Sequence, residues 1–130
     1  MDHRVLVIED DPTIREVLIE VLGEHGYEAV GASNGREALD ALASTSDRPC
    51  VILLDLMMPI MDGRSFREEQ MLQPDLSGIP VIVISAHLDH AVTADLNCAA
   101  YLRKPVKLSD VLEQVREYCV SCGNAAPSVG

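Results

Sequence analysis

The sequence predicts a doubly wound α/β domain, in which a parallel β-sheet carries helices on both faces. Strand-like and helix-like patterns alternate five times along the 130 residues, as expected of repeated strand–helix units. Segments 50–54 and 81–84 are apolar at every position, which is typical of strands buried on both faces of a parallel sheet. A chain of this length supports one domain with its own core.

The first strand–helix unit begins with the apolar strand 4–8. Pro12 suits the first turn of the helix that follows, and Asp11 fits its N-cap position. Gly26 provides a stop for this helix. Between Pro12 and Gly26, apolar residues recur at the spacing of one helix face: Ile14, Val17, Leu18, Val21 and Leu22.

The other four units repeat the order of strand, turn and helix. Ser33-Asn34-Gly35, with Glu37 close behind, marks a turn or a helix cap after the second strand. The expected strands are 27–32, 50–54, 81–84 and 100–102, and the expected helices are 36–44, about 64–71, 88–97 and 108–119. The last residues, 123–130, are small and polar and are expected to form a flexible tail.

The net charge of −11 at pH 7 restricts the class of partner. An acidic surface repels phosphate backbones and anionic lipids, so we expect no direct binding to nucleic acid or membranes. No apolar run approaches the roughly 20 residues needed to cross a bilayer. The N-terminus runs into the first strand without a signal-peptide pattern, and we therefore expect a cytoplasmic protein.

The four cysteines are Cys50, Cys98, Cys119 and Cys122, and the last two form a C-x-x-C pattern. A structural zinc site needs a second ligand pair, and none has suitable spacing. A redox C-x-x-C opens a helix after a strand, whereas this pair lies at the end of the last helical pattern. The expectation is therefore ordinary thiols in a reducing cytosol.

Polar side chains come directly after four of the apolar strands. Glu9 and Asp10 follow the first strand, Asp55 the third, Ser85 the fourth and Lys104 the fifth. In doubly wound sheets, ligands bind outside the carboxyl ends of the strands, where the strand order reverses. Each residue alone has an ordinary interpretation, as a helix-start acid, a loop cap, a structural hydroxyl or a surface lysine. Together, in this order, they indicate a functional site.

The acids suggest a metal site. Clustered carboxylates repel one another, and a divalent cation removes that repulsion. An all-oxygen ligand set suits Mg²⁺, with ligands from Glu9, Asp10, Asp55 and the backbone carbonyl of Met57.

The same residues fit phosphoryl transfer. Asp55 is the candidate nucleophile toward phosphorus. Lys104 would balance charge on the transferring group, and Ser85 would donate its hydroxyl to a phosphoryl oxygen. Pro105 would fix the loop that carries Lys104. A cis Lys104–Pro105 bond is not expected from the sequence alone, because cis is the minor form even before proline.

The sequence resembles the receiver domains of two-component response regulators from residue 4 to about residue 120. The most specific motif is Asp55-Leu56-Met57-Met58-Pro59-Ile60-Met61-Asp62-Gly63. The other matching segments are Val5-Leu6-Val7-Ile8-Glu9-Asp10-Asp11, Ile79-Pro80-Val81-Ile82-Val83-Ile84-Ser85-Ala86 and Tyr101-Leu102-Arg103-Lys104-Pro105.

The resemblance implies a role for each matched residue. Asp55 matches the phosphoacceptor, Glu9 and Asp10 match the acidic pair that binds Mg²⁺, and Met57 matches the residue that gives the metal its backbone carbonyl. Ser85 matches the switch hydroxyl and Lys104 the lysine that pairs with the phosphoryl group. Tyr101 matches the aromatic residue whose rotamer reports the switch: Ser85 moves toward the phosphoryl group and Tyr101 turns inward.

The resemblance also implies a flavodoxin-like fold with strand order 2-1-3-4-5. Residues 1–122 would form the receiver domain. The phosphoryl donor would be a histidine kinase or a phosphotransfer protein, and the output would pass to a protein partner or to an output domain outside this chain. Such a domain assists its own phosphorylation and dephosphorylation but is not an enzyme acting on a separate product.

Departures from the family pattern lie near the usual output face. The segment from Ser85 to Lys104 is shorter than usual by about one helical turn, and Val106 stands where a Phe often follows Lys-Pro. These changes leave the phosphorylation residues intact but argue against standard dimerisation through that face. His87 and Met57 lie two residues past Ser85 and Asp55, where side chains tune hydrolysis of the phosphoryl group, so altering His87 is predicted to change phosphoryl lifetime.

Three other functions fit less well. A Mg²⁺-dependent phosphatase or mutase with an aspartyl nucleophile needs a second Asp at the position of Met57. A phosphorylation-independent interaction domain on the same fold, a pseudo-receiver, typically lacks one of the acids or the lysine, and none is missing here. A nucleotide-binding module needs a glycine-rich loop after the first strand, which is absent.

Overall fold

The computed structural model describes residues 3–121, which contain a five-stranded parallel sheet. The strands are β1 (Arg4–Ile8), β2 (Glu28–Ala32), β3 (Val51–Asp55), β4 (Val81–Ser85) and β5 (Ala100–Arg103). Their spatial order, β2-β1-β3-β4-β5, confirms the predicted flavodoxin-like topology. The strand order reverses between β1 and β3, which is the switch point at which such sheets bind ligands.

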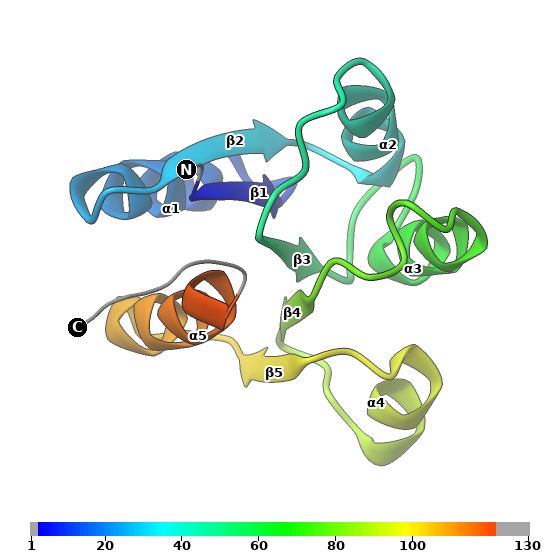
Figure 1. Cartoon of the computed structure of the whole chain (residues 1–130). Coiled ribbons are helices and arrows are strands. Elements are labelled where there is room, and N and C mark those ends of the chain that lie inside the picture. The colour runs from blue at the N-terminus through cyan, green and yellow to red at the C-terminus, as the bar shows by residue number, and fades with distance from the viewer. Residues whose placement is uncertain (1–2, 122–130) are drawn as a thin grey trace.

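The helices connect the strands and cover both faces of the sheet. They are α1 (Pro12–Glu24), α2 (Gly35–Ala43), α3 (Gly63–Leu72), α4 (His90–Leu96) and α5 (Leu108–Ser121). Figure 1 shows α1 and α5 on one face and α2, α3 and α4 on the other. The predicted helix 88–97 is real but shorter, since α4 begins at His90 and ends at Leu96.

Two apolar clusters form the core, one on each face of the sheet. Because β3 and β4 are buried at every position, alternate side chains of each strand enter different clusters. Val51 and Leu53 of β3 pack with residues of α1 and α5, whereas Ile52 and Leu54 pack with residues of α2, α3 and α4. This double burial explains why the two strands have no polar alternation.

Three helices start at side chains that satisfy their first backbone N–H groups. Asp11 accepts hydrogen bonds from the start of α1, as the sequence predicts. Asn34 caps α2, and Glu37 reaches back to accept from the N–H of Ser33, the residue before the cap, at 2.6 Å, an arrangement similar to a capping box. Asp62 caps α3 in the same way as Asp11 caps α1. Such caps typically contribute about 1 kcal/mol each.

The helix α1 is confirmed, and its apolar face is only partly buried. Leu18 and Leu22 are 4% and 1% exposed, whereas Ile14 and Val17 keep 36% and 40% of their surface exposed. Ile14 and Val17 line an open groove between α1 and the residues that lead into α5, such as Val106. The periodicity identifies the face of the helix but not how far a neighbouring helix covers it.

Cys50 and Cys119 form a disulfide bond, so the expectation of ordinary thiols is wrong for these two residues. Cys50 immediately precedes β3 and Cys119 lies in α5, and both are buried in the cluster between the sheet, α1 and α5. Their Cα atoms are 5.0 Å apart, a separation that a disulfide spans. The pairing joins residues 69 positions apart, so no local pattern announces it. Cys98 is a free thiol, and Cys122 lies outside the described residues.

Two further expectations concern the tail and the membrane. The predicted tail, 123–130, lies outside the residues that the structure describes. Between residues 3 and 121, no helix has the length and apolar character needed to cross a bilayer.

Candidate functional site

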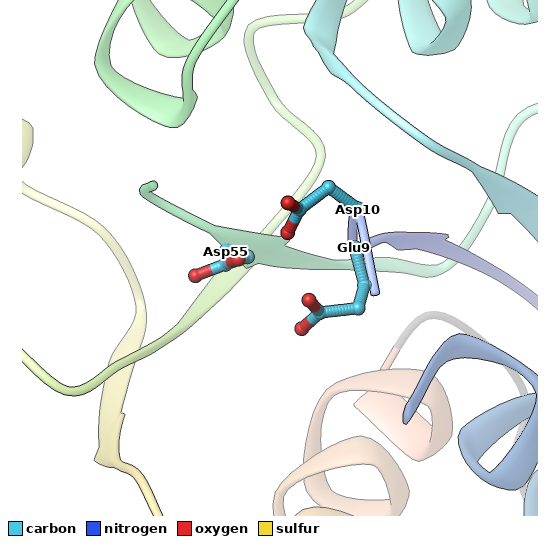
Figure 2. Close-up of side chains that lie close together, drawn as sticks. All are labelled: Glu9, Asp10 and Asp55. Carbon is cyan, nitrogen blue, oxygen red and sulfur yellow. The ribbon is translucent and has the colours of Figure 1, made fainter. Parts of the chain in front are cut away.

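The carboxyl ends of β1 and β3 bring three carboxylates together. These strands are parallel neighbours, with Ile8 opposite Leu54, so the residues that follow them leave the sheet at the same edge. Figure 2 shows Glu9 and Asp10, just after β1, beside Asp55 at the end of β3. One carboxylate oxygen from each of the three residues lies within 4.8 Å of the others. The structure thus assembles the three acids that the sequence singled out.

The three acids differ in exposure. Glu9 and Asp55 are 3% and 5% exposed, whereas Asp10 is exposed. The backbone of Glu9 is held by Arg15, whose guanidinium donates to the Glu9 carbonyl at 2.8 Å. The side chain of Glu9 accepts from the N–H of Asp11 at 3.1 Å. The site therefore combines two buried carboxylates, of which that of Glu9 is held by hydrogen bonds, with the exposed carboxylate of Asp10.

Lys104 supplies the opposing charge. Its Nζ donates to Oε1 of Glu9 at 3.0 Å and lies 3.6 Å from Oδ2 of Asp55. Burial acts to lower the pKa of Lys104, but the hydrogen bond to Glu9 and the charge of Asp55 outweigh it and raise the pKa. The ammonium form is thus favoured. The Lys104–Pro105 peptide bond is cis, the less expected of the two forms.

Asp55 is the acid most affected by its surroundings. Burial and the neighbouring charge of Glu9 raise its pKa to about 6, although Lys104 acts in the opposite direction. A single ammonium group therefore does not compensate three clustered carboxylates. A divalent cation would, and carboxylate oxygens are the donors that Mg²⁺ prefers.

Ser85 ends β4, the strand next to β3, and is fully buried. Its Oγ accepts a hydrogen bond from the N–H of His87 at 3.2 Å. A hydroxyl that accepts through a lone pair still has its own proton to donate. Ser85 therefore has one donor available at the edge of the sheet where the acids meet.

Tyr101 lies apart from the acids, on the α4 side of the sheet. Its hydroxyl donates to the carbonyl of Thr93 in α4 at 2.9 Å and accepts from the N–H of Cys98 at 2.6 Å. Its ring packs against the cluster formed with α2, α3 and α4. In this conformation the Tyr101 hydroxyl is bound to Thr93 within α4 and to Cys98 just after that helix, and any switch would have to exchange these two hydrogen bonds.

The acids and Lys104 line an open pocket. The same pocket is lined by Asp11, Ile14, Met57, Ala86 and His87. The Met57 side chain is 64% exposed, and its backbone N–H lies 3.5 Å from Oδ1 of Asp55. Met57 and His87, the two positions that the sequence linked to hydrolysis, thus lie in one pocket with Asp55.

Gly63 has a role that the sequence analysis did not assign. A Cβ added to it would lie 2.6 Å from the carbonyl oxygen of Asp55 and 2.8 Å from Cα of Leu56. Only a residue without a side chain lets the start of α3 approach the end of β3 so closely. The glycine was visible in the sequence, at the end of the motif that closes with Asp62-Gly63. The reason that glycine is required there becomes clear only from the packing of α3 against the end of β3.

Comparisons with known proteins agree with this arrangement. A sequence model of the family described as response regulator receiver domain matches residues 5–116. The chain is also similar to the response regulator MprA of Mycolicibacterium vanbaalenii, with 36% identity over 119 residues. The matched region covers 89% of this chain and 50% of MprA, so the chain spans about half the length of the curated relatives that it matches.

Solved structures are similar over almost the whole chain. The signal receiver domain of a signal transduction histidine kinase from Syntrophus aciditrophicus has a TM-score of 0.83 and 32% identity, covering 98% of this chain and 97% of that one. The phosphorylated cyanobacterial phytochrome response regulator RcpA has a TM-score of 0.78 and 28% identity, covering 95% and 98%.

Proposed function

Because the chain belongs to the response regulator receiver domain family, we propose that Asp55 accepts a phosphoryl group from a phosphorylated histidine of a partner protein. The observation that carries this proposal is the meeting of Asp55 with Glu9, Asp10 and Lys104 at the switch point of the sheet. The donor would be a histidine kinase or a phosphotransfer protein.

Mg²⁺ fits the donor set of this site. Glu9, Asp10 and Asp55 offer carboxylate oxygens close enough to share one ion, and we assign the backbone carbonyl of Met57 as a further ligand. When bound, the ion would neutralise the carboxylates and the charge on the phosphoryl oxygens. The raised pKa of Asp55 supports this assignment, since it reflects negative charge that the protein alone does not balance.

Three residues of the chain would have different roles in the transfer step. A carboxylate oxygen of Asp55 attacks phosphorus while the P–N bond to the donor imidazole breaks, and the electron pair of that bond returns to the ring. Lys104 already lies 3.6 Å from Asp55 and would pair with a phosphoryl oxygen. The buried hydroxyl of Ser85 would donate to another phosphoryl oxygen.

Receiver domains are signalling domains, and we propose that this one passes its state on through protein contacts. Phosphorylation adds charge and acceptor oxygens beside Ser85. Movement of Ser85 would favour a second packing in which Tyr101 exchanges its bonds to Thr93 and Cys98, which alters the face of α4, β5 and α5. The target would be a protein partner or an output domain outside this chain. We assign residues 1–122 to the receiver domain and propose a cytoplasmic location.

The test is the intact mass of the protein after incubation with acetyl phosphate, with and without Mg²⁺. Wild type should gain one phosphoryl group in a Mg²⁺-dependent manner, and Asp55→Asn should gain none. Asp62→Asn is the matched control, because Asp62 is exposed and caps α3, a role that asparagine also fills. Loss of the adduct in Asp55→Asn alone supports the proposal.

A folded wild-type protein that gains no adduct from any small phosphodonor would favour the phosphorylation-independent interaction domain instead. The site would then be a metal-binding or structural cluster. An adduct that persists in Asp55→Asn would place the acceptor elsewhere and contradict the proposal directly.

A further inference from the structure

Arg103, the last residue of β5, holds the loop between β4 and α4 (residues 86–89). Its guanidinium donates to the carbonyl oxygen of Leu88 at 2.8 Å and to that of Ala86 at 3.3 Å. Arg103 lies opposite Ser85 in the pairing of β4 with β5, so its side chain starts beside the end of β4. A planar guanidinium that binds two carbonyls of one loop fixes the residue between them, His87.

The basic residue that ends β5 and the one that follows it, Arg103 and Lys104, reach different partners. Lys104 reaches the acids, whereas Arg103 reaches the loop. Tyr101, two residues earlier, lies on the same side as Arg103 and binds Thr93 of α4. Tyr101 and Arg103 thus hold α4 and the loop before it, while Lys104, just after β5, serves the phosphorylation site.

The loop that Arg103 holds is part of the site. Ala86 and His87 line the pocket that contains Asp55 and Lys104. The N–H of His87 donates to Oγ of Ser85, so the position of the His87 backbone decides which lone pair of that hydroxyl is used and where its proton points. A shift of the loop would therefore reorient the hydroxyl without moving any carboxylate.

We propose that Arg103 is a positioning residue for phosphoryl transfer to Asp55. By binding the carbonyls of Ala86 and Leu88, it holds His87 so that the Ser85 hydroxyl is already oriented toward the incoming phosphoryl group. Donors that are oriented in advance stabilise the charge that develops during transfer, whereas a mobile donor has to be ordered during the step. This inference rests on the proposed function of Asp55. Arg103 itself contacts neither the acids nor the reacting atoms.

The first test measures the rate of phosphorylation by acetyl phosphate at several donor concentrations for Arg103→Met and Arg103→Lys. Arg103→Met should lower the maximal rate roughly three- to tenfold, a modest cost for a displaced positioning group. The Mg²⁺ concentration for half-maximal rate should stay within about twofold, since no ligand moves. Arg103→Lys should fall between wild type and Arg103→Met, because an ammonium is a point charge and does not form the two-pronged contact.

Arg64→Met is the matched control, since it removes a guanidinium of α3 whose partner, Asp95, is exposed. It should leave the rate unchanged. Hydrogen exchange of the backbone amides in residues 86–89 gives a second measurement, independent of phosphorylation. The exchange should be faster in Arg103→Met than in wild type or Arg64→Met, because the loop has lost its anchor.

The possible outcomes separate this inference from the proposed function. If wild type is phosphorylated but Arg103→Met reacts at the wild-type rate, the inference is wrong and the proposed function stands. A slower reaction accompanied by a changed Mg²⁺ concentration for half-maximal rate would mean that Arg103 acts through the acids. That result would also overturn the inference. If wild type gains no phosphoryl group, the proposed function fails first, and faster loop exchange would leave Arg103 with a structural role only.

Discussion

Among single residues, Asp55 is the one whose charge conflicts most with its surroundings. Its pKa is raised to about 6, mainly by burial and then by the charge of Glu9. An aspartate in an unfolded chain titrates near 4, so between about pH 4 and pH 6 the folded chain holds a proton that the unfolded chain has lost. The stability that this proton provides is fully present below about pH 4 and is lost as the pH rises through about 6.

Replacing Asp55 with Asn should therefore stabilise the metal-free protein at pH 7.5. The expected gain in the free energy of unfolding is about 1–3 kcal/mol, since each unit of pKa shift corresponds to about 1.4 kcal/mol. The gain should shrink toward pH 5, where the wild-type carboxyl group is largely protonated. Urea unfolding at several pH values, without Mg²⁺, measures this difference.

The control for this prediction is again Asp62→Asn, which makes the same change in net charge at an exposed position. It should change stability by less than about 0.5 kcal/mol, as is usual for surface substitutions. Equal effects of the two variants would show that repulsion within the acid cluster does not dominate the energetics of Asp55.

His87 lies in the pocket with Asp55, and its ring is exposed. Removing the ring in His87→Ala should open the approach to the phosphoryl group and shorten its lifetime by about tenfold or less, because the pocket then excludes water less well. Loss of the phosphoryl adduct over time, followed by intact mass, measures the lifetime. His25→Ala, at the exposed end of α1, is the control. An unchanged rate of dephosphorylation in His87→Ala rules the prediction out.

Among the elements, α3 is positioned by a glycine. Gly63→Ala would place a methyl group 2.6 Å from the backbone oxygen of Asp55, and neither backbone segment can yield easily. We expect a loss of about 1–3 kcal/mol of stability and slower phosphorylation, since the end of β3 must shift. Thermal unfolding and the acetyl phosphate reaction measure both effects.

Gly23→Ala is the matched control, because no atom lies within 4 Å of the added Cβ and Gly23 is inside α1. Alanine favours helix by up to about 1 kcal/mol over glycine, so this variant should be as stable as wild type or more so. Comparable destabilisation by both substitutions would mean that the close approach of α3 to the end of β3 is not the reason for the effect of Gly63→Ala.

The order of the elements could be predicted because their signals are local. Fully apolar strands such as 81–84 and caps such as Asp11 and Asn34 depend on neighbours within a few residues. The exposure of Ile14 and Val17 could not be predicted, because it depends on how far α5 extends over α1. Amphipathic spacing shows which side of a helix is apolar, and tertiary packing decides how much of it is covered.

The residues of the site also fall into those that could be predicted from the sequence and those that could not. Glu9, Asp10, Asp55, Ser85 and Lys104 could be selected from the sequence, because each directly follows or ends an apolar strand and parallel strands end at one edge. The role of Arg103 could not be predicted, because nothing in the sequence around an arginine beside a lysine at a strand end indicates which residues it binds. Its two carbonyl partners lie 15 and 17 residues away in a loop and become visible only in the structure.

At the scale of the whole molecule, the Cys50–Cys119 disulfide encloses more than half of the chain. It joins the start of β3 to α5 across 69 residues. Closing a loop of this length restricts the unfolded chain and stabilises the folded one by about 4 kcal/mol in the chain-entropy account. A domain typically has only about 5–15 kcal/mol of stability in total, so the oxidation state of this pair should dominate its resistance to unfolding.

Reduction with dithiothreitol should therefore lower the urea midpoint of wild type strongly. It should leave Cys50→Ser/Cys119→Ser unchanged, whereas Cys98→Ser should respond as wild type does, since Cys98 is a free thiol in the opposite cluster. Thiol counting on the denatured, unreduced protein checks whether the bond is present, and a full set of four reactive thiols would contradict it.

Phosphorylation of the folded protein should persist in both the oxidised and the reduced state. Cys50 immediately precedes β3 and Asp55 ends it, about 17 Å apart at the usual rise of a strand. The reduced thiols remain apolar side chains within the same buried cluster.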